Sequence, residues 1–288
     1  MHGSPSRREY LAVAGTAIVT GTAGCMDGSE ADQEMSPSET GGDTSGATSS
    51  KASTDSETTP LVTGADAPFE PFVVNTEPDK LTGFDVEMLE TVIETMPAHT
   101  HDRWLALDEW PDDFIDAING GGADVGVGAV TILDQREQEW GVRFTDSYFV
   151  INQAFFVSAG SQYQPTAPPD LTAHTIGAKQ GTTGAREVTD LIKKGILDPE
   201  ALETFPHIED AIQQVVDGSL DVGVIDHPVA QSYSDEFDIE IAFEIYTGEE
   251  YGFVVDESRD TLLKALNDGI ATVRSNDALF GGLVSEWF

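Results

Sequence analysis

The chain has 288 residues, and its 52 Asp and Glu residues against 14 Lys and Arg residues give a formal net charge of −38. That balance argues against nucleic acid as a partner, which requires a basic surface, and against adhesion to anionic lipid. The 39% of hydrophobic residues is enough for a core, so the acidity does not indicate a disordered chain. Molar salt shortens the Debye length to about 3 Å and screens such self-repulsion. The composition therefore predicts a protein adapted to very high salt, as in halophilic archaea.

Residues 1–25 are predicted to be an export signal. Arg7 and Arg8 resemble a twin-arginine pair, and the apolar stretch at 11–22 is shorter than the roughly 18 residues that a membrane-spanning helix needs. The stretch ends in Thr22-Ala23-Gly24-Cys25, which resembles a lipobox with Thr22 in place of the usual aliphatic residue. Cys25 is the only cysteine, which excludes a disulfide framework. We therefore expect lipidation of Cys25 and anchoring to the outer face of the cytoplasmic membrane.

Residues 26–59 form a tether in this interpretation. They are almost all Ser, Thr, Gly, Asp, Glu and Ala, with neither a strand nor a helix period. Such a segment cannot bury enough apolar surface to offset the entropy of ordering, and it is expected to be flexible.

The globular part is expected to begin at Pro60 and to alternate strands with helices. Runs of apolar residues predict strands, and apolar residues at helical spacing predict helices. In chain order the expected elements are a strand at 61–65, helices at 85–96 and 111–119, strands at 124–130, 151–157 and 175–179, helices at 183–194 and 208–216, strands at 221–225 and 251–255, a helix at 260–274 and a last helix to Trp287. This alternation is typical of an α/β architecture rich in parallel strands.

Two stretches of the chain share one pattern. A helix, a Gly-containing turn and a strand that starts Asp-Val-Gly-Val occur around residues 120–127 and again around 218–224. The repetition indicates two lobes built on similar plans. The turn at 120–122 is not a phosphate cradle, because no Gly-Lys-Ser/Thr follows it.

Several motifs resemble one family in order and spacing. They are Ala67-Pro68-Phe69-Glu70-Pro71-Phe72, Gly83-Phe84-Asp85-Val86-Glu87, the run from Asp124 to Arg136, Phe144-Thr145-Asp146-Ser147-Tyr148, the run from Asp221 to Pro228, Tyr251-Gly252-Phe253-Val254-Val255 and the final Glu286-Trp287-Phe288. From Leu61 to Phe288 the chain resembles the polar amino-acid binding proteins of ABC importers, extracellular solute-binding family 3.

The resemblance implies a two-lobed α/β fold of the periplasmic-binding-protein type (type II) with two hinge crossings. Lobe one would comprise residues 60–149 plus 247–288, and lobe two residues 150–246. The crossings would lie near Phe149–Asn152 and Ile245–Gly248. Binding would close the lobes on the solute by a hinge motion.

A free amino acid carries a carboxylate and an ammonium, and a closed site must neutralise both. Arg136 matches the family's carboxylate clamp, and a guanidinium is a two-pronged donor for a carboxylate. Thr131 and Thr183 are expected to add hydroxyl and N–H contacts, with Thr183 at a helix start that favours an anion. Asp226 is expected to hold the ammonium, and it could also cap a helix that opens at Pro228. The neighbouring His227 is interpreted as polar surface.

The pocket for the solute's side chain is predicted from the remaining motif positions. Asp66 would face the side chain, Phe69 and Trp110 would form aromatic walls, and Lys179 would reach the same region. Gly128 and Ala129 would offer free backbone carbonyls. Asp66 favours a donor, whereas Lys179 repels a cation, so a neutral polar amino acid such as glutamine is expected first and a basic one second.

Three functions compete for this scaffold: an importer's binding component, an enzyme resembling cyclohexadienyl dehydratase, and a ligand sensor. An enzyme would need an acid in the cleft, and Glu70 is the only additional acid expected near the site. A sensor would need a membrane helix and a cytoplasmic domain. We expect the first: a monomer without cofactor or metal, with an ABC permease and ATPase as partners, attached to the membrane through its lipid anchor only.

Overall fold

The computed structural model describes residues 58–77, 80–234 and 236–288. The predictions for the export signal, for Cys25 and for nearly all of the tether lie outside these residues. Residues Ser56–Phe288 form one compact unit. Within the described ranges, no helix has the length and apolar character needed to cross a membrane.

Lobe one, as we use the term from here, is built on a five-stranded sheet of order β4-β1-β5-β12-β6. β1 pairs in parallel with β4 and β5, whereas β12 pairs antiparallel with β5 and β6. The strands are β1 (Thr59–Asp66), β4 (His99–Leu107), β5 (Val125–Val127), β6 (Val142–Phe144) and β12 (Val254–Asp256). A two-stranded sheet of β2 (Val74–Glu77) and β3 (Lys80–Thr82) lies outside it.

The helices of lobe one pack on this sheet and on each other. They are α1 (Phe84–Glu94), α2 (Asp112–Asn119), α3 (Asp134–Trp140), α7 (Asp260–Arg274) and α8 (Asp277–Trp287). The apolar stripe of α1, with Val86, Leu89 and Val92 fully buried, faces the core. Because α7 packs against α1, the end of the chain returns to the lobe in which the described chain begins.

Lobe two is built on a second sheet of order β11-β7-β10-β8-β9, in which β10 pairs in parallel with β8 and antiparallel with β7. Its strands are β7 (Phe149–Ser158), β8 (Ile176–Lys179), β9 (Leu202–Phe205), β10 (Val222–Asp226) and β11 (Ile239–Tyr251). Its helices are α4 (Thr183–Lys193), α5 (Ile208–Val216), α6 (His227–Ser234) and the short 3-10 helix η2 (Pro168–Leu171).

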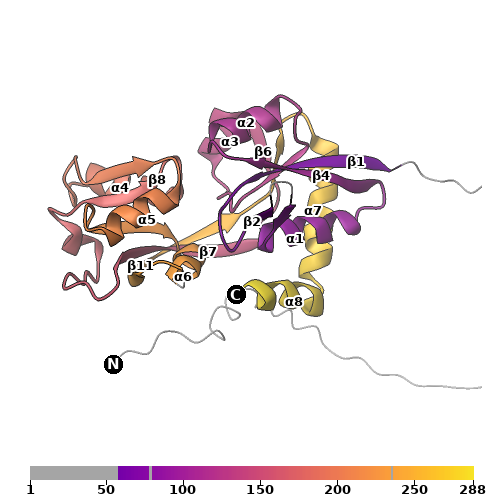
Figure 1. Cartoon of the computed structure of the whole chain (residues 1–288). Coiled ribbons are helices and arrows are strands. Elements are labelled where there is room, and N and C mark those ends of the chain that lie inside the picture. Colours follow the sequence, from indigo (N-terminus) through magenta and orange to yellow (C-terminus); the bar gives the residue numbers. More distant parts are fainter. Residues whose placement is uncertain (1–57, 78–79, 235) are drawn as a thin grey trace, which may run out of the picture. The chain divides into compact units, whose positions relative to one another are not determined.

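Two strands carry the chain between the lobes. β7 and β11 pair antiparallel from Ser158–Ile239 in lobe two to Phe149–Tyr251 beside lobe one, and Figure 1 shows both running between the two groups of elements. The pairing shifts register between Ile245 and Glu249, where Gly248 adopts a left-handed φ of 60°. The strand pairing is interrupted at this point, which makes it a natural place for the two strands to bend. The predicted two-lobed fold with two crossings is confirmed.

Two expectations about elements need correction, and β4 and α3 are two of the elements that were not predicted. Both sheets are mixed rather than dominated by parallel strands, and the strand expected at 251–255 is divided between β11 and β12. β4 was not predicted because it is half-exposed and has no apolar run. α3 was not predicted because its only buried residue is Arg136, so it has no apolar stripe.

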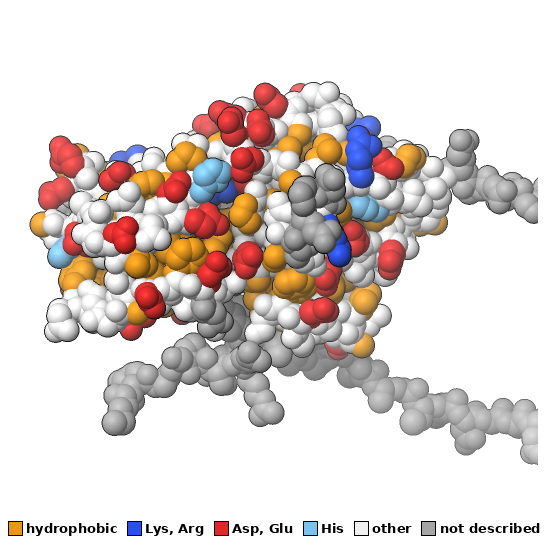
Figure 2. Space-filling model, in the orientation of Figure 1, with side chains coloured by type: hydrophobic (Ala, Val, Ile, Leu, Met, Phe, Trp, Pro, Cys, Tyr) orange, Lys and Arg blue, Asp and Glu red, His pale blue; other side chains and the backbone are white. Residues whose placement is uncertain are grey.

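Acidic side chains are spread over the face of the molecule in Figure 2, where Lys and Arg are few. Most acidic side chains of the described residues are on the surface, whereas Asp66, Asp85, Asp226 and Glu249 are buried.

Candidate functional site

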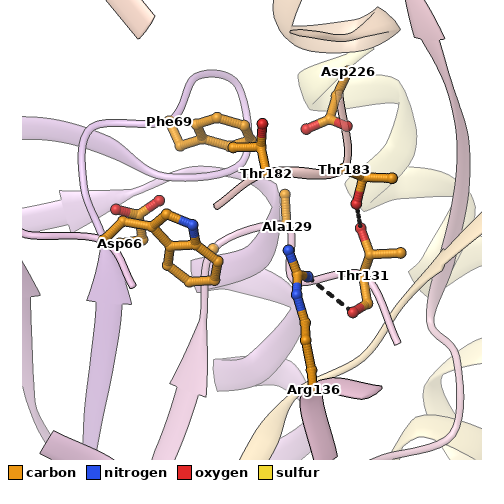
Figure 3. Close-up of a pocket in the computed structure, with 10 residues that line it drawn as sticks. Asp66, Phe69, Ala129, Thr131, Arg136, Thr182, Thr183 and Asp226 are labelled. Atoms are coloured by element: carbon orange, nitrogen blue, oxygen red, sulfur yellow. Dashed lines mark hydrogen bonds between the residues drawn. The ribbon is translucent and has the colours of Figure 1, made fainter. Parts of the chain in front are cut away.

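A cavity of about 280 Å³, counting space open to solvent, lies between residues of the two lobes. Its lining comprises Asp66, Phe69, Trp110, Gly128, Ala129, Thr131, Arg136, Thr182, Thr183 and Asp226. Figure 3 places Asp66 and Asp226 on opposite sides of the cavity, with Arg136 entering between them.

Strand ends position most of these groups. Asp66 ends β1, Lys179 ends β8 and Asp226 ends β10, while Gly128 and Ala129 directly follow β5. In α/β sheets the carboxyl ends of the strands are where ligands bind, because the connections leave open space there. The site is therefore assembled from the carboxyl ends of strands in two facing lobes.

Arg136 is a buried cation whose charge is not matched by an acid. Its Nη1 donates to the carbonyl of Thr131 in lobe one at 3.0 Å, and its Nη2 donates to the carbonyl of Gly181 in lobe two at 3.0 Å. Its guanidinium lies 4.9 Å from the ring centroid of Trp140. Among the described residues it forms no ion pair, and burial, followed by repulsion from Arg186, lowers the pKa of Arg136 to about 10. Its remaining N–H donors are available to an anion.

The start of α4 adds further donors beside Arg136. Thr183 is the first residue of the helix, as expected, and the side chain of the preceding Thr182 caps it by accepting from the backbone N–H of Ala185. Thr183 Oγ1 lies 3.0 Å from Thr131 Oγ1, joining the two lobes. A helix N-terminus presents free N–H groups and partial positive charge. The arrangement therefore favours a carboxylate next to the guanidinium.

A buried ion pair occupies the opposite side of the cavity. Lys179 Nζ of lobe two donates to Asp66 Oδ2 of lobe one at 2.7 Å, and both side chains are less than 10% exposed. The Lys179 ammonium also lies 5.3 Å from the ring centroid of Phe69 and 5.9 Å from that of Trp110. Burial raises the pKa of Asp66, and Lys179 opposes that shift. A carboxylate and an ammonium side by side can accept from and donate to one polar group.

Asp226 lies in an acidic environment. It is only 6% exposed, and it accepts a hydrogen bond from Gln153 Nε2, which also donates to Glu249 Oε1 at 3.0 Å. Burial and the negative charge of Glu249 raise the pKa of Asp226 to about 8, against the lowering effects of Gln153, Tyr251 and Arg136. A cation at this place would favour the ionised form of Asp226.

Asp85 fixes the backbone of the cavity wall. Its Oδ2 accepts hydrogen bonds from the N–H groups of Gly128 (3.1 Å) and Ala129 (2.6 Å). Gly128 has φ 136°, and a Cβ there would lie 2.9 Å from Asp66 Cβ, so this turn requires glycine. Ala129 follows with φ 53°, a conformation that Asp85 helps to hold. Asp85 is thus a positioning residue that the sequence analysis did not single out, although its motif was recognised.

All of the predicted ligand residues line the cavity except Lys179, which reaches it through Asp66. Thr182, Gln153 and Glu249 were missed. Only the Gly-Thr-Thr turn before α4 could have indicated Thr182, whereas nothing local marks Gln153 and Glu249, which meet Asp226 through strand pairing.

Two minor expectations were wrong. His227 is buried rather than surface-exposed, and its Nε2 lies 3.1 Å from Glu244 Oε1. Glu70 is not the only acid near the site, because Glu249 is closer to Asp226 through Gln153. No group of three or more His, Cys, Asp or Glu side chains within the described ranges is arranged to hold a metal ion.

Two lobes joined by paired strands, with a small charged cavity between them, define a type II solute-binding protein. Comparison with known proteins gives the family: residues 61–288 match the bacterial extracellular solute-binding proteins, family 3. Because this match spans most of the chain, the protein belongs to that family, and the resemblance seen in the sequence is confirmed.

Individual relatives are moderately similar. A probable histidine-binding protein of Neisseria gonorrhoeae is 27% identical over 220 residues, 74% of this chain and 77% of that protein. An L-arginine-binding protein of Pseudomonas aeruginosa is 27% identical over 225 residues, 77% and 79% of the two chains. The structure of an ancestral arginine-binding protein bound to arginine matches with 26% identity and a TM-score of 0.70, covering 80% of this chain and 98% of that one.

Proposed function

We propose that the cavity binds a single zwitterionic α-amino acid, and that the protein delivers it to an ABC permease and ATPase. The proposal is based on two groups of opposite ionic type that lie in one cavity, a guanidinium and a carboxyl group, neither of which has an ion-pair partner in the described part of the chain. Arg136 of lobe one and Asp226 of lobe two line the same cavity, and each lacks an oppositely charged ion-pair partner among the described residues. An unpaired buried charge is costly, so the pair indicates a ligand that neutralises both.

The carboxylate of the solute is assigned to Arg136, Thr131, Thr182 and Thr183. Arg136 retains unused donors, and the N-terminus of α4 lies beside it. The ammonium is assigned to Asp226. Because the two groups belong to different lobes, one zwitterion would link them and favour the closed form.

The solute's side chain is assigned to the Asp66–Lys179 pair and the rings of Phe69 and Trp110. A carboxamide carries an acceptor oxygen and donor N–H groups, so it can insert between Lys179 and Asp66 and satisfy both. The buried Trp110 Nε1 has no hydrogen-bond partner in the described structure and can donate to the same group. We therefore propose glutamine first.

A basic amino acid is the second candidate, and the relatives named for histidine and arginine favour it. A guanidinium or ammonium would have to displace Lys179 from Asp66. The displaced Lys179 ammonium would then lie close to the positive charge of the solute's side chain. This repulsion is why the site favours an amide over a basic side chain.

A thermal-shift panel of the twenty amino acids in molar salt tests this proposal. A ligand at a hundredfold excess over its Kd stabilises the folded state by about 2.7 kcal/mol, so the true solute should raise the melting temperature by several degrees. We expect glutamine to give the largest shift. A panel in which only leucine-like solutes, or none at all, moved the midpoint would contradict the assignment.

Non-enzymatic action is part of the same proposal. Conversion of a cyclohexadienyl substrate by the purified protein, followed by chromatography, would instead identify it as an enzyme on this scaffold.

The location of the protein is proposed from its sequence and family. We propose that the protein is exported through the twin-arginine signal, lipidated at Cys25 and adapted to high salt. We also propose that it is a monomer with lobe bounds at 60–149 plus 247–288 and at 150–246. Cys25→Ser should release the protein from membranes into the medium, as fractionation and immunoblotting would reveal. Equal membrane retention of the variant and the wild type would refute the anchor.

A further inference from the structure

Gln153 and Glu249 extend the environment of Asp226 into the hinge. Gln153 lies on β7 and Glu249 on β11, the two strands that cross between the lobes. Glu249 Oε1 accepts from Gln153 Nε2 at 3.0 Å and from Thr247 Oγ1 at 2.9 Å, and its Oε2 accepts from Thr131 Oγ1 at 2.9 Å. Two buried carboxyl groups therefore share one amide nitrogen, and the shared network touches lobe one, lobe two and the hinge.

Hydrogen-bond donors are distributed unequally between the two acids. Glu249 accepts from three side chains, Gln153, Thr131 and Thr247, whereas Asp226 accepts from Gln153 and is stabilised in its charged form by the hydroxyl of Tyr251. Donors stabilise the charged form of a carboxyl group. If one of the two acids is neutral, that acid is Asp226, which is also the one that lines the cavity.

Other charged groups around Asp226 and Glu249 do not neutralise the negative charge of these two acids. Arg136 faces it from lobe one, but its two recorded bonds go to backbone carbonyls. From α4, Arg186 acts on Arg136, and Glu187 adds negative charge near Glu249. Tyr251 of β11 faces both acids, and Asp85 and Tyr148 lie behind it. Acids thus outnumber bases around the pair.

We propose that Gln153 and Glu249 are positioning residues of the amino-group site, and that Asp226, held close to the Glu249 carboxyl group by their shared amide donor, carries a proton in the empty protein. The ammonium of a bound amino acid replaces that proton. In the balanced step, the Asp226 carboxyl group loses H⁺ to solvent and its carboxylate pairs with the incoming R–NH₃⁺, with no change in the ligand's own protonation. The raised pKa of Asp226 agrees with this geometry.

This inference rests on the proposed function, since it assumes an ammonium at Asp226. It adds that Glu249, which does not line the cavity, strengthens the pH dependence of binding that the burial of Asp226 creates. Glu249 lies where the β7–β11 pairing shifts register, so it links the charge at the ligand to the hinge. A residue with only a structural role would alter stability without altering the number of protons exchanged.

Calorimetry in molar KCl at pH 7 tests the inference with L-glutamine as the probe. Titrations in phosphate and in Tris, whose ionisation enthalpies differ, give the number of protons released on binding. Wild type should release close to one proton. Glu249→Gln should release measurably fewer protons, because the substitution removes the charged neighbour of Asp226 while its burial remains. Glu250→Gln, a neighbouring exposed position on the same strand, is the matched control and should behave like wild type.

A second measurement separates this inference from the proposed solute. Carbon-13 NMR of Asp carboxyl groups in the ligand-free wild type should find a group titrating near pH 8 that is missing in Asp226→Asn. Burial also raises the pKa of Asp85, to about 6, and that of Asp66, so their signals should be the same in both proteins. Binding heat without proton release, or a ligand-free protein in which Asp226 ionises below pH 6, would overturn the inference. Absence of any heat with L-glutamine would refute the proposed solute, and the NMR titration would still decide the inference.

Discussion

Arg136→Ala is the perturbation for which the structure gives the clearest magnitude. The guanidinium is 6% exposed and forms no ion pair among the described residues, so the variant leaves the carboxylate of the ligand without its main counter-charge. Breaking one partner of a buried pair costs about 3–5 kcal/mol. At about 1.4 kcal/mol per tenfold, that loss weakens binding by roughly 10²–10⁴-fold.

The assay is calorimetric titration with L-glutamine, together with a thermal melt of each empty protein. Arg136→Lys is informative because it keeps the charge but cannot form a two-pronged contact, so it should retain part of the affinity. Arg143→Ala, an exposed position on β6, is the control and should bind like wild type. If Arg136→Ala bound L-glutamine within about threefold of wild type, the assignment of the carboxylate to Arg136 would be wrong, because threefold corresponds to well under 1 kcal/mol.

Three further predictions concern stability and motion. For Asp226 the folded pKa of about 8 lies above its ordinary value of 3.8, so the folded state retains a proton that the unfolded state has lost; the empty protein should lose about 1.4 kcal/mol of stability per pH unit between about pH 4 and 8. Asp226→Asn should make that slope shallower in urea titrations, most clearly between pH 6 and 8, because burial raises the pKa of Asp85 only to about 6. The variant should be more stable than wild type at pH 8 while binding far more weakly, and an unchanged slope between pH 6 and 8 would refute the assignment of this pH dependence to Asp226. Gly128→Ala should destabilise the protein by about 1–3 kcal/mol, because φ is 136° and the new Cβ meets Asp66, and Gly121→Ala, with a positive φ but open space, should cost less in the same melts. Small-angle scattering in molar salt should show a smaller radius of gyration with saturating L-glutamine, and an unchanged radius despite tight binding would rule out closure.

Sequence patterns were most informative where a motif and a strand end coincide. Asp226 was predicted because it follows a buried apolar strand, whereas Asp66 and Gly128 were predicted from motif positions, and the structure places both at the carboxyl ends of strands. Arg136 was found through its motif, since nothing in the pattern of α3 marks it as buried. Resemblance therefore contributed what periodicity could not.

The rest of the site depends on pairing between distant strands. Gln153 and Glu249 are 96 positions apart, and only the register of β7 against β11 and β10 brings both to Asp226. Likewise, the sequence indicated Asp66 and Lys179 as pocket residues but could not show that they bond to each other across the lobes. That contact strengthens the argument for a carboxamide, because it presents a donor and an acceptor side by side.

Salt dependence follows from the surface charge rather than from the site. With a formal net charge of −38, self-repulsion should lower the melting temperature in dilute buffer, and molar KCl should raise it. The buried groups of the site are screened much less, so the relative order of amino acids in the panel should persist across salt concentrations.

The most direct test of the central claim, a zwitterion held between Arg136 and Asp226, is a calorimetric comparison of L-glutamine with two analogues. One analogue lacks the α-amino group and the other lacks the α-carboxylate. The account predicts that L-glutamine binds and that each analogue binds at least about a hundredfold more weakly, since one analogue cannot form the ion pair with Asp226 and the other cannot form the ion pair with Arg136. Equal affinity for L-glutamine and either analogue would contradict the account.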